Sequence, residues 1–148
     1  MEWTKDDFRI STDKDKLHVA YVHQFLSNSY WAANIPLDVV QRSINGSLCF
    51  GVYYSEQQIG FARVITDEAT FAYLADVFID EAFRGKGLSK WLMEIILGYP
   101  TLQGLRRFML ATRDAHELYR QFGFNELTFT DRWMQIHWPD VYKNGLNH

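Results

Sequence analysis

The chain has 148 residues, 47% of them hydrophobic, and this size is usual for one compact domain, so we expect a single domain over residues 1–148. A formal net charge of -3 and a pI near 5.9 argue against a dedicated nucleic-acid-binding protein, which normally carries a basic face. The only cysteine, Cys49, excludes an intramolecular disulfide and a multi-cysteine zinc site, and it favours a cytoplasmic location.

Membrane and metal binding are also disfavoured by the sequence. No segment approaches the roughly 18 apolar residues that span a bilayer, and residues 1–7 lack the basic and apolar regions of a secretory signal. The five histidines form no i, i+4 pair and no HExxH pattern. We therefore expect a protein without a membrane partner and without a bound metal.

The predicted elements begin with a short strand at residues 8–10. Helical spacing of apolar side chains predicts a helix over residues 13–27, and a second helix over residues 36–44 begins with Pro36. Two β-branched or aromatic runs, at residues 48–54 and 59–65, are separated by residues 55–58 and predict an antiparallel hairpin.

A third strand is predicted at residues 71–79, which are almost continuously apolar. Such a pattern is typical of a strand that is covered on both faces, and Asp76 is its only charged residue. An isolated carboxylate on an apolar strand has two explanations. It is either a functional group with a perturbed pKa that faces a cleft, or a structural ion pair within the core.

The second half of the chain continues the alternation of strands and helices. Apolar residues spaced at i, i+3, i+4, i+7 and i+8 predict a helix over residues 88–96, which Gly98 and Pro100 end. Residues 108–111 then predict a strand that is joined to residues 71–79 by a right-handed crossover between parallel neighbours.

The last predicted elements are one helix and two strands. Asp114 and Glu117 resemble a capping box for a short helix that ends at Gly123. Two terminal strands are predicted at residues 126–129 and 133–137. The order of elements indicates a mixed α/β fold.

The residues that carry the clearest chemical signal form a glycine loop, Arg84-Gly85-Lys86-Gly87-Leu88-Ser89. They follow a buried strand and open a helix, so backbone N–H groups and the positive end of the helix dipole converge on one point. Glycine lets an anion approach the backbone closely, and the basic side chains add positive charge. The loop is neither a P-loop nor a dinucleotide fingerprint, because Leu88 and Lys90 stand where those motifs need other residues.

This loop resembles the signature of the GNAT superfamily of N-acetyltransferases, Gln/Arg-x-x-Gly-x-Gly/Ala, except that Ser89 replaces the final small residue. The similarity extends over residues 71–124. It implies a GNAT-like fold, with a central mixed sheet of about six to seven strands and about four helices. It also implies acetyl-CoA as the cosubstrate, held by Val77, Phe78, Ile79, Arg84, Gly85, Lys86, Gly87, Leu88, Ser89 and Asp114.

The resemblance also implies a mechanism, in which an amine attacks the thioester directly within a ternary complex. Tyr119 stands where family members place the tyrosine that protonates the leaving thiolate, although packing on the sheet is an alternative role. Asp76 or a chain of water molecules takes the proton of the amine. Tyr30, Trp31 and Trp133 occupy regions that border the acceptor pocket in the family, and ordinary aromatic packing is the competing explanation.

The sequence thus predicts an N-acetyltransferase that acts on a primary amine of a small molecule or a peptide. Family members are often homodimers, so a dimer is possible. The alternative from another class is a domain that binds acyl-CoA as a sensor without turnover. Cys49 lies in an apolar strand, where a buried structural thiol is the expected role.

Overall fold

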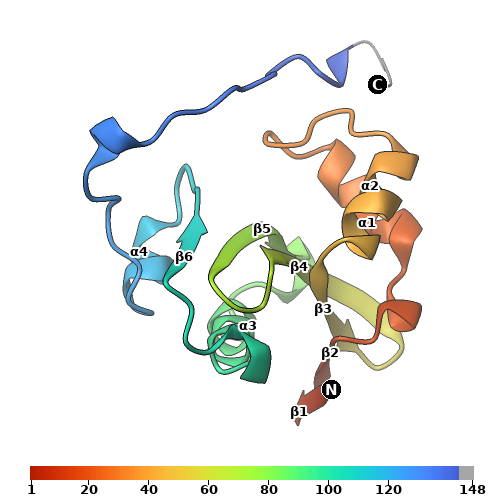
Figure 1. Ribbon diagram of the computed structural model, residues 1–148. Coiled ribbons are helices and arrows are strands. Elements are labelled where there is room, and N and C mark those ends of the chain that lie inside the picture. Colours follow the sequence, from red (N-terminus) through yellow and green to blue (C-terminus); the bar gives the residue numbers. More distant parts are fainter. Residues whose placement is uncertain (144–148) are drawn as a thin grey trace.

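The computed structural model describes residues 1–143, which fold around one six-stranded sheet with strand order β1-β2-β3-β4-β5-β6 (Figure 1). The strands are β1 (Glu2–Lys5), β2 (Phe8–Ser11), β3 (Leu48–Tyr54), β4 (Gln57–Thr66), β5 (Phe71–Ile79) and β6 (Arg107–Leu110). The α-helices are α1 (Val19–Ser27), α2 (Leu37–Asn45), α3 (Leu88–Leu97) and α4 (His116–Arg120). The expected mixed sheet with four helices is therefore confirmed.

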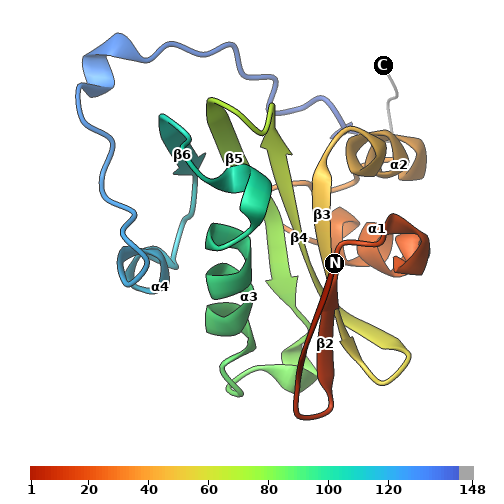
Figure 2. The ribbon, with the colours of Figure 1, turned by 60° about the horizontal axis from the view of Figure 1, so that its bottom comes forward.

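One pair of neighbouring strands in the described sheet, β5 and β6, is parallel. Strands β1 to β5 form an antiparallel meander, whereas β5 and β6 run parallel and are joined through α3. Helices α1 and α2 cover one face of the sheet, and α3 with α4 lies on the opposite side (Figure 2). The only parallel pair described therefore adjoins the loop that begins α3.

The core consists of two clusters, one on each face of the sheet. The larger cluster joins the apolar stripe of α3, including Leu92 and Ile96, to the inner residues of β3, β4 and β5. The smaller cluster packs Val22 of α1 and Val40 of α2 on Phe61 and Phe78. Because successive side chains of a strand point to opposite faces, each central strand supplies both clusters, as the apolar run at residues 71–79 predicted.

The amino-terminal part differs from the sequence prediction in two places. The predicted strand at residues 8–10 is confirmed, but it pairs with an additional strand, β1, through the turn at Asp6. The helix predicted over residues 13–27 is divided, because a 3-10 turn (Lys14–Lys16) precedes an extended residue, Leu17, before α1. The N–H of His18 donates to the buried side-chain oxygen of Gln58 at 2.7 Å, which anchors this break to β4.

The predicted capping box of the last helix is wrong. Helix α4 has Ala115 as its N-cap residue, and no side chain caps it. Asp114 is exposed, and the hydroxyl of Thr112 accepts a hydrogen bond from the N–H of Ala115 at 3.0 Å instead. Thr112 thus stabilises the turn before α4 and does not cap the helix itself.

The two predicted terminal strands are also absent from the described part of the chain. Residues 125–143, which we call the C-terminal arm, contain a 3-10 turn, Thr130–Arg132, and otherwise cross over the end of the molecule without joining the sheet (Figures 1 and 2). Every residue from 126 to 140 is exposed. The β-type composition of these segments cannot form strands here, because a strand needs a neighbouring backbone to satisfy its hydrogen-bonding groups.

The α-helices of residues 1–143 are short, with five to ten residues each. None of the helices described is long and apolar enough to cross a membrane. No group of three or more His, Cys, Asp or Glu side chains within these residues is arranged to hold a metal ion.

Candidate functional site

The site is organised by a bulge in β5 at Asp76. Between the pairs Phe61↔Phe78 and Arg63↔Ala75, β5 has two residues where β4 has one. Asp76 adopts a φ of 56°, a left-handed conformation that is uncommon for a residue with a side chain. Such a conformation costs about 1–3 kcal/mol and persists only where the surroundings fix it.

The bulge lies two residues beyond the last pair between the parallel strands, Leu74↔Leu110. Strand β6 pairs only with residues 71–74 of β5, and within the described chain the rest of β5 pairs with β4 alone. The residues expected to bind the coenzyme arm, Val77, Phe78 and Ile79, lie in this separated half of β5. Within the described residues no strand pairs with this side of β5 beyond Leu74, so backbone hydrogen-bonding groups there are available to a ligand.

Both oxygens of the Asp76 carboxylate accept hydrogen bonds from protein groups. One oxygen accepts a hydrogen bond from Nε of Arg63 at 2.9 Å, and the other accepts from Nε1 of Trp31 at 2.8 Å. The side chains of Asp76 and Arg63 are only 9% and 16% exposed. This geometry supports the structural interpretation of Asp76, because the ion pair and the indole together fix the bulge.

The glycine loop follows directly after this strand. Nε of Arg84 donates to the backbone oxygen of Ile79 at 3.0 Å, so this side chain ties the loop to the end of β5. Gly85 and Gly87 have φ values of 79° and 77°, which favour glycine. A Cβ atom at either position would meet no heavy atom within 4 Å. These glycines are therefore required by backbone conformation, and the space beside them is open.

The start of α3 supplies the donors that an anion needs. Gly87 is the N-cap residue, no side chain caps the helix, and the first turn carries no acidic residue. The first helical hydrogen bond runs from the N–H of Trp91 to the oxygen of Gly87. The N–H groups of Leu88, Ser89 and Lys90 therefore remain for a ligand, beside the exposed side chain of Lys86.

Tyr119 lies on α4 with only 9% of its surface exposed, and its ring packs edge-on against Phe124, with 6.0 Å between the ring centroids. Burial raises the pKa of its hydroxyl, and the nearby hydroxyl of Tyr30 contributes to the increase. Among the described residues this hydroxyl has no hydrogen-bond partner. Tyr119 is thus a neutral phenol that can donate a proton to a ligand.

Tyr30 and Trp31 reach toward the same place from the loop between α1 and α2. Trp31 contacts Asp76, as described, and packs edge-on against Tyr30, with 5.1 Å between the ring centroids. The guanidinium carbon of Arg113, which follows β6, lies 3.7 Å from the centre of the Tyr30 ring. Both aromatic residues are exposed, so they form an accessible wall beside the separated strands.

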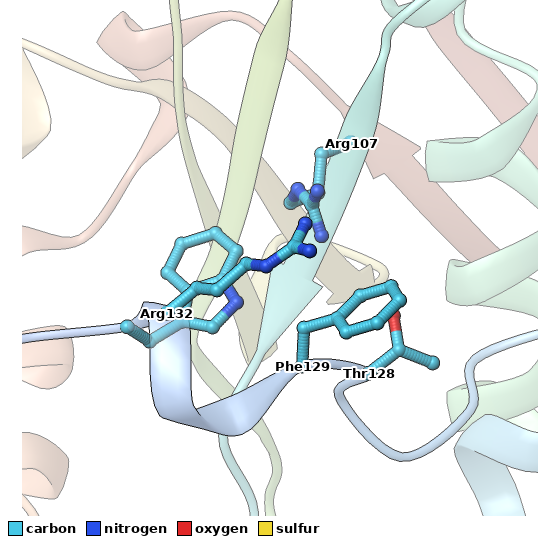
Figure 3. Close-up of a pocket in the computed structure, with 5 residues that line it drawn as sticks. Arg107, Thr128, Phe129 and Arg132 are labelled. Carbon is cyan, nitrogen blue, oxygen red and sulfur yellow. The ribbon is translucent and has the colours of Figure 1, made fainter.

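Trp133 lies elsewhere. It belongs to the C-terminal arm, where it lines a separate pocket with Arg107, Thr128, Phe129 and Arg132 (Figure 3). Arg107 is the first residue of β6 and pairs with Phe71, whereas the bulge at Asp76 is five residues further along β5. The structure therefore brings Asp76, Tyr30, Trp31 and Tyr119 into one region and leaves Trp133 at the other end of β6.

Sequence reasoning missed two arginines of this region. Arg63 is the only charged residue of the run at residues 59–65, as Asp76 is of residues 71–79. One opposite charge in each of two neighbouring apolar strands is a signal for a cross-strand ion pair. No comparable pattern in the sequence marked Arg113. It lies in a loop, and only the folded chain brings it to Tyr30.

Cys49 takes the structural role that the sequence predicted. Its side chain is buried in the smaller core cluster, and burial raises the pKa of its thiol to about 11. A thiol in this state carries little thiolate near neutral pH, so it is a weak nucleophile.

The mixed sheet and the glycine loop that begins α3 are those that the resemblance to the GNAT superfamily implied. The profile of the Acetyltransferase (GNAT) family matches residues 6–124. A candidate acetyltransferase of Gibberella zeae is 34% identical over an alignment of 170 positions, which covers 99% of this chain and 95% of that protein. The chain belongs to the GNAT acetyltransferase family.

Solved structures agree with this assignment. The crystal structure of a candidate GNAT acetyltransferase from Xanthomonas campestris has a TM-score of 0.90 and 48% identity, with 92% of this chain and 96% of that chain covered. A candidate acetyltransferase from Clostridium acetobutylicum, solved with acetyl-CoA, shares the fold at 17% identity, with a TM-score of 0.65 and with 93% of this chain and 96% of that chain covered. The [ribosomal protein bS18]-alanine N-acetyltransferase of Haemophilus ducreyi is 30% identical over 103 residues, covering 64% of this chain and 68% of that protein.

Proposed function

We propose that this protein transfers the acetyl group of acetyl-CoA to a primary amine by direct attack in a ternary complex. The observation that carries the proposal is the end of the pairing between β5 and β6 at Leu74, two residues before the Asp76 bulge, in the strand that leads to the glycine loop. This arrangement offers one continuous path for an elongated cosubstrate. The N–H groups at the start of α3 would hold its pyrophosphate, and the backbone of Val77, Phe78 and Ile79 would hold the pantetheine arm.

The chemistry follows from the groups beside this path. The amine nitrogen forms a bond to the thioester carbon, and the bond from that carbon to sulfur breaks. A backbone N–H of the separated strand stabilises the oxyanion that forms between these steps. The thiolate takes a proton from Tyr119, whose raised pKa keeps the phenol protonated until the thiolate appears.

The proton of the attacking amine needs a separate route. Both oxygens of Asp76 already accept hydrogen bonds, so we assign this residue a positioning role and direct the proton to water. Tyr30 and Trp31 form the wall along which the amine approaches. An amine acceptor also agrees with the named activity of the relative from Haemophilus ducreyi.

The direct test is the release of free thiol from acetyl-CoA in the presence of a panel of primary amines, including peptides with a free amino terminus. We expect release that depends on the acceptor and gives the N-acetylated product in equal amount by mass spectrometry. Coenzyme binding without acceptor-dependent release for any amine would contradict catalysis. It would support an acyl-CoA sensor instead.

A further inference from the structure

A second site is indicated by the pocket between β6 and the C-terminal arm (Figure 3). Its space is on the order of 230 Å³, several times the roughly 30 Å³ that one water molecule occupies in the liquid. Arg107 contributes from β6, and Thr128, Phe129, Arg132 and Trp133 contribute from the arm. The pocket is thus large enough for a carboxylate or phosphate group and the chain that carries it.

The two arginines of this pocket are held in place by aromatic rings. The guanidinium carbon of Arg107 lies 4.8 Å from the centre of the Trp133 ring, and that of Arg132 lies 4.1 Å from the centre of the Phe129 ring. The two guanidinium groups point toward one another (Figure 3). Stacking on a ring limits the rotamers of an arginine, so less freedom is lost when it binds a ligand.

Neither guanidinium has an acidic partner within the described residues. The ion pairs of these residues involve Arg9, Lys16, Arg42, Arg63 and Arg120 instead. Two like charges that converge without a counter-ion repel each other, and an anion between them would remove this repulsion. Carboxylates and phosphates match the planar fork of arginine and accept two hydrogen bonds from it.

The pocket is separate from the region that the pyrophosphate would occupy. Arg107 pairs with Phe71 at the start of β5, and the glycine loop follows Ile79 at its end. These ends are about 25 Å apart at the usual rise of a strand. A coenzyme bound at the loop therefore leaves the two arginines to another molecule.

The pocket does share a face of the sheet with the Trp31–Asp76 contact. Phe108 packs into the larger core cluster with α3, so its neighbour Arg107 points to the opposite face. Ala62 and Val64 also belong to that cluster, so Arg63, the partner of Asp76, points to the same face as Arg107. Five residues of β5 separate the two places, which corresponds to roughly 15 Å.

We propose that Arg107 and Arg132 bind a carboxylate or phosphate group of the acceptor, about 15 Å from the amine that is acetylated. This inference rests on the proposed acetyl transfer. It defines the acceptor as an elongated amine with a distal anion, and it makes the two arginines determinants of specificity.

Anion binding can be measured without any turnover. Inorganic phosphate and glutarate are titrated by calorimetry into protein that is saturated with coenzyme A, so that the glycine loop is occupied. We expect saturable binding in the unmodified protein. The affinity should fall at least about tenfold in the double variant that carries both Arg107→Gln and Arg132→Gln, because two charge-assisted hydrogen-bond donors are lost. Arg106→Gln removes a neighbouring exposed charge outside the pocket and should change the affinity less than about twofold. Equal losses in both variants would overturn the pocket as a site.

Acceptor choice provides the second measurement. Pentapeptides with a free amino terminus and an amidated carboxyl terminus are compared as pairs that differ only at position five, glutamate against glutamine and phosphoserine against serine. We expect kcat/KM to be about tenfold higher for the anionic member, and we expect this ratio to approach one in Arg107→Gln but not in Arg106→Gln. The pair with the larger ratio identifies the preferred anion, and ratios near one in the unmodified protein would overturn the proposal. If no amine is acetylated, the proposed function fails, while the titration still decides whether the pocket binds anions.

Discussion

Replacing Tyr119 by phenylalanine removes one hydroxyl and keeps the ring that packs against Phe124. If the hydroxyl protonates the thiolate, kcat should fall about 100-fold, because general acid catalysis by a positioned group is typically worth this much or more. Coenzyme A affinity, measured by calorimetry, should change little. Equal losses in kcat and affinity would show that Tyr119 only helps to bind the coenzyme.

The raised pKa of Tyr119 also predicts the form of the pH profile. Its hydroxyl is protonated below its pKa, which lies above the ordinary value of about 10, so the acid is present throughout the neutral range. The rate should rise from pH 6 to 9 as more of the acceptor amine loses its proton. A fall in kcat within this range that disappears in Tyr119→Phe would contradict the direction of this pKa.

Asp76 can be tested as a positioning residue by changing it to asparagine. An amide oxygen can still accept the hydrogen bond from Trp31, but the charge opposite Arg63 is lost. Breaking a largely buried ion pair from one side typically costs about 3 kcal/mol, and this loss should appear in the free energy of unfolding from urea titration. Arg63→Gln, which keeps the carboxylate, should cost a similar amount.

Kinetics of the same two variants separate the roles of Asp76. A positioning residue should lower kcat to a similar extent in Asp76→Asn and Arg63→Gln, with an unchanged pH profile. A catalytic base would instead lose about 100-fold or more in kcat in Asp76→Asn alone. It would also lose the acidic limb of the profile, and that result would reverse our assignment.

At the scale of elements, the turn between β4 and β5 depends on one exposed carboxylate. Oδ1 of Asp67 accepts hydrogen bonds from the N–H groups of Ala69, Thr70 and Phe71 at 3.0, 2.8 and 3.2 Å. These hydrogen bonds lower the pKa of Asp67 strongly. The bonds from Thr70 have the largest effect, and those from Ala69 and Phe71 have smaller effects. This turn joins the two strands that carry the ion pair of the bulge.

Because the pKa of Asp67 is lowered in the folded state, its contribution to the free energy of unfolding should be larger at neutral pH than at acidic pH. The stabilisation by Asp67 is fully present above the unfolded-state pKa of about 3.9, and it is lost as the pH falls toward the lower pKa of the folded state. Asp67→Asn should therefore lower the urea midpoint of unfolding at pH 7, and this difference should shrink at pH 3. A difference that is as large at pH 3 would show that charge on Asp67 does not stabilise the turn.

Elements with a strong local pattern were predictable, and those that depend on distant partners were not. Strands β3 and β5 and helix α3 follow from uninterrupted apolar runs or a clear helical period, so their predicted bounds hold to within one residue. Strand β1 is mostly polar and forms only because β2 lies beside it. The segments at residues 126–129 and 133–137 have strand-like composition without a neighbouring strand in this chain.

Some features of the candidate site could likewise be predicted from the sequence, and others could not. The glycine loop was predictable because its left-handed residues and its place before a helix are local properties of the sequence. The bulge at Asp76 could not be predicted from the sequence, because the groups that contact Asp76, Arg63 and Trp31, lie 13 and 45 residues away in sequence. The contact of Arg107 with Trp133 of the C-terminal arm could not be predicted from the sequence for the same reason.

At the scale of the whole molecule, the proposed coenzyme path runs beside elements that have few contacts with the central strands. Strand β6 contacts β5 over four residue pairs, and α4 follows it without a capping side chain. A ligand that binds the start of α3, the end of β5 and Tyr119 would join these elements to the central strands. Because it binds the folded chain and not the unfolded one, it should raise the stability of the entire domain.

Coenzyme A should therefore raise the melting temperature, and Gly87 should be required for the effect. At 100 times its Kd the ligand contributes about 2.7 kcal/mol, which corresponds to an increase of roughly 5–10 °C for a domain of this size. In Gly87→Ala a side chain is forced into a φ of 77° at the helix start, so the loop should deform and most of the increase should vanish. Gly46→Ala is the matched control, because Gly46 has a φ of -94° and space for a Cβ atom, and it should keep the full increase. An undiminished increase in Gly87→Ala, measured by scanning calorimetry, would place the coenzyme away from the glycine loop and contradict the path proposed here.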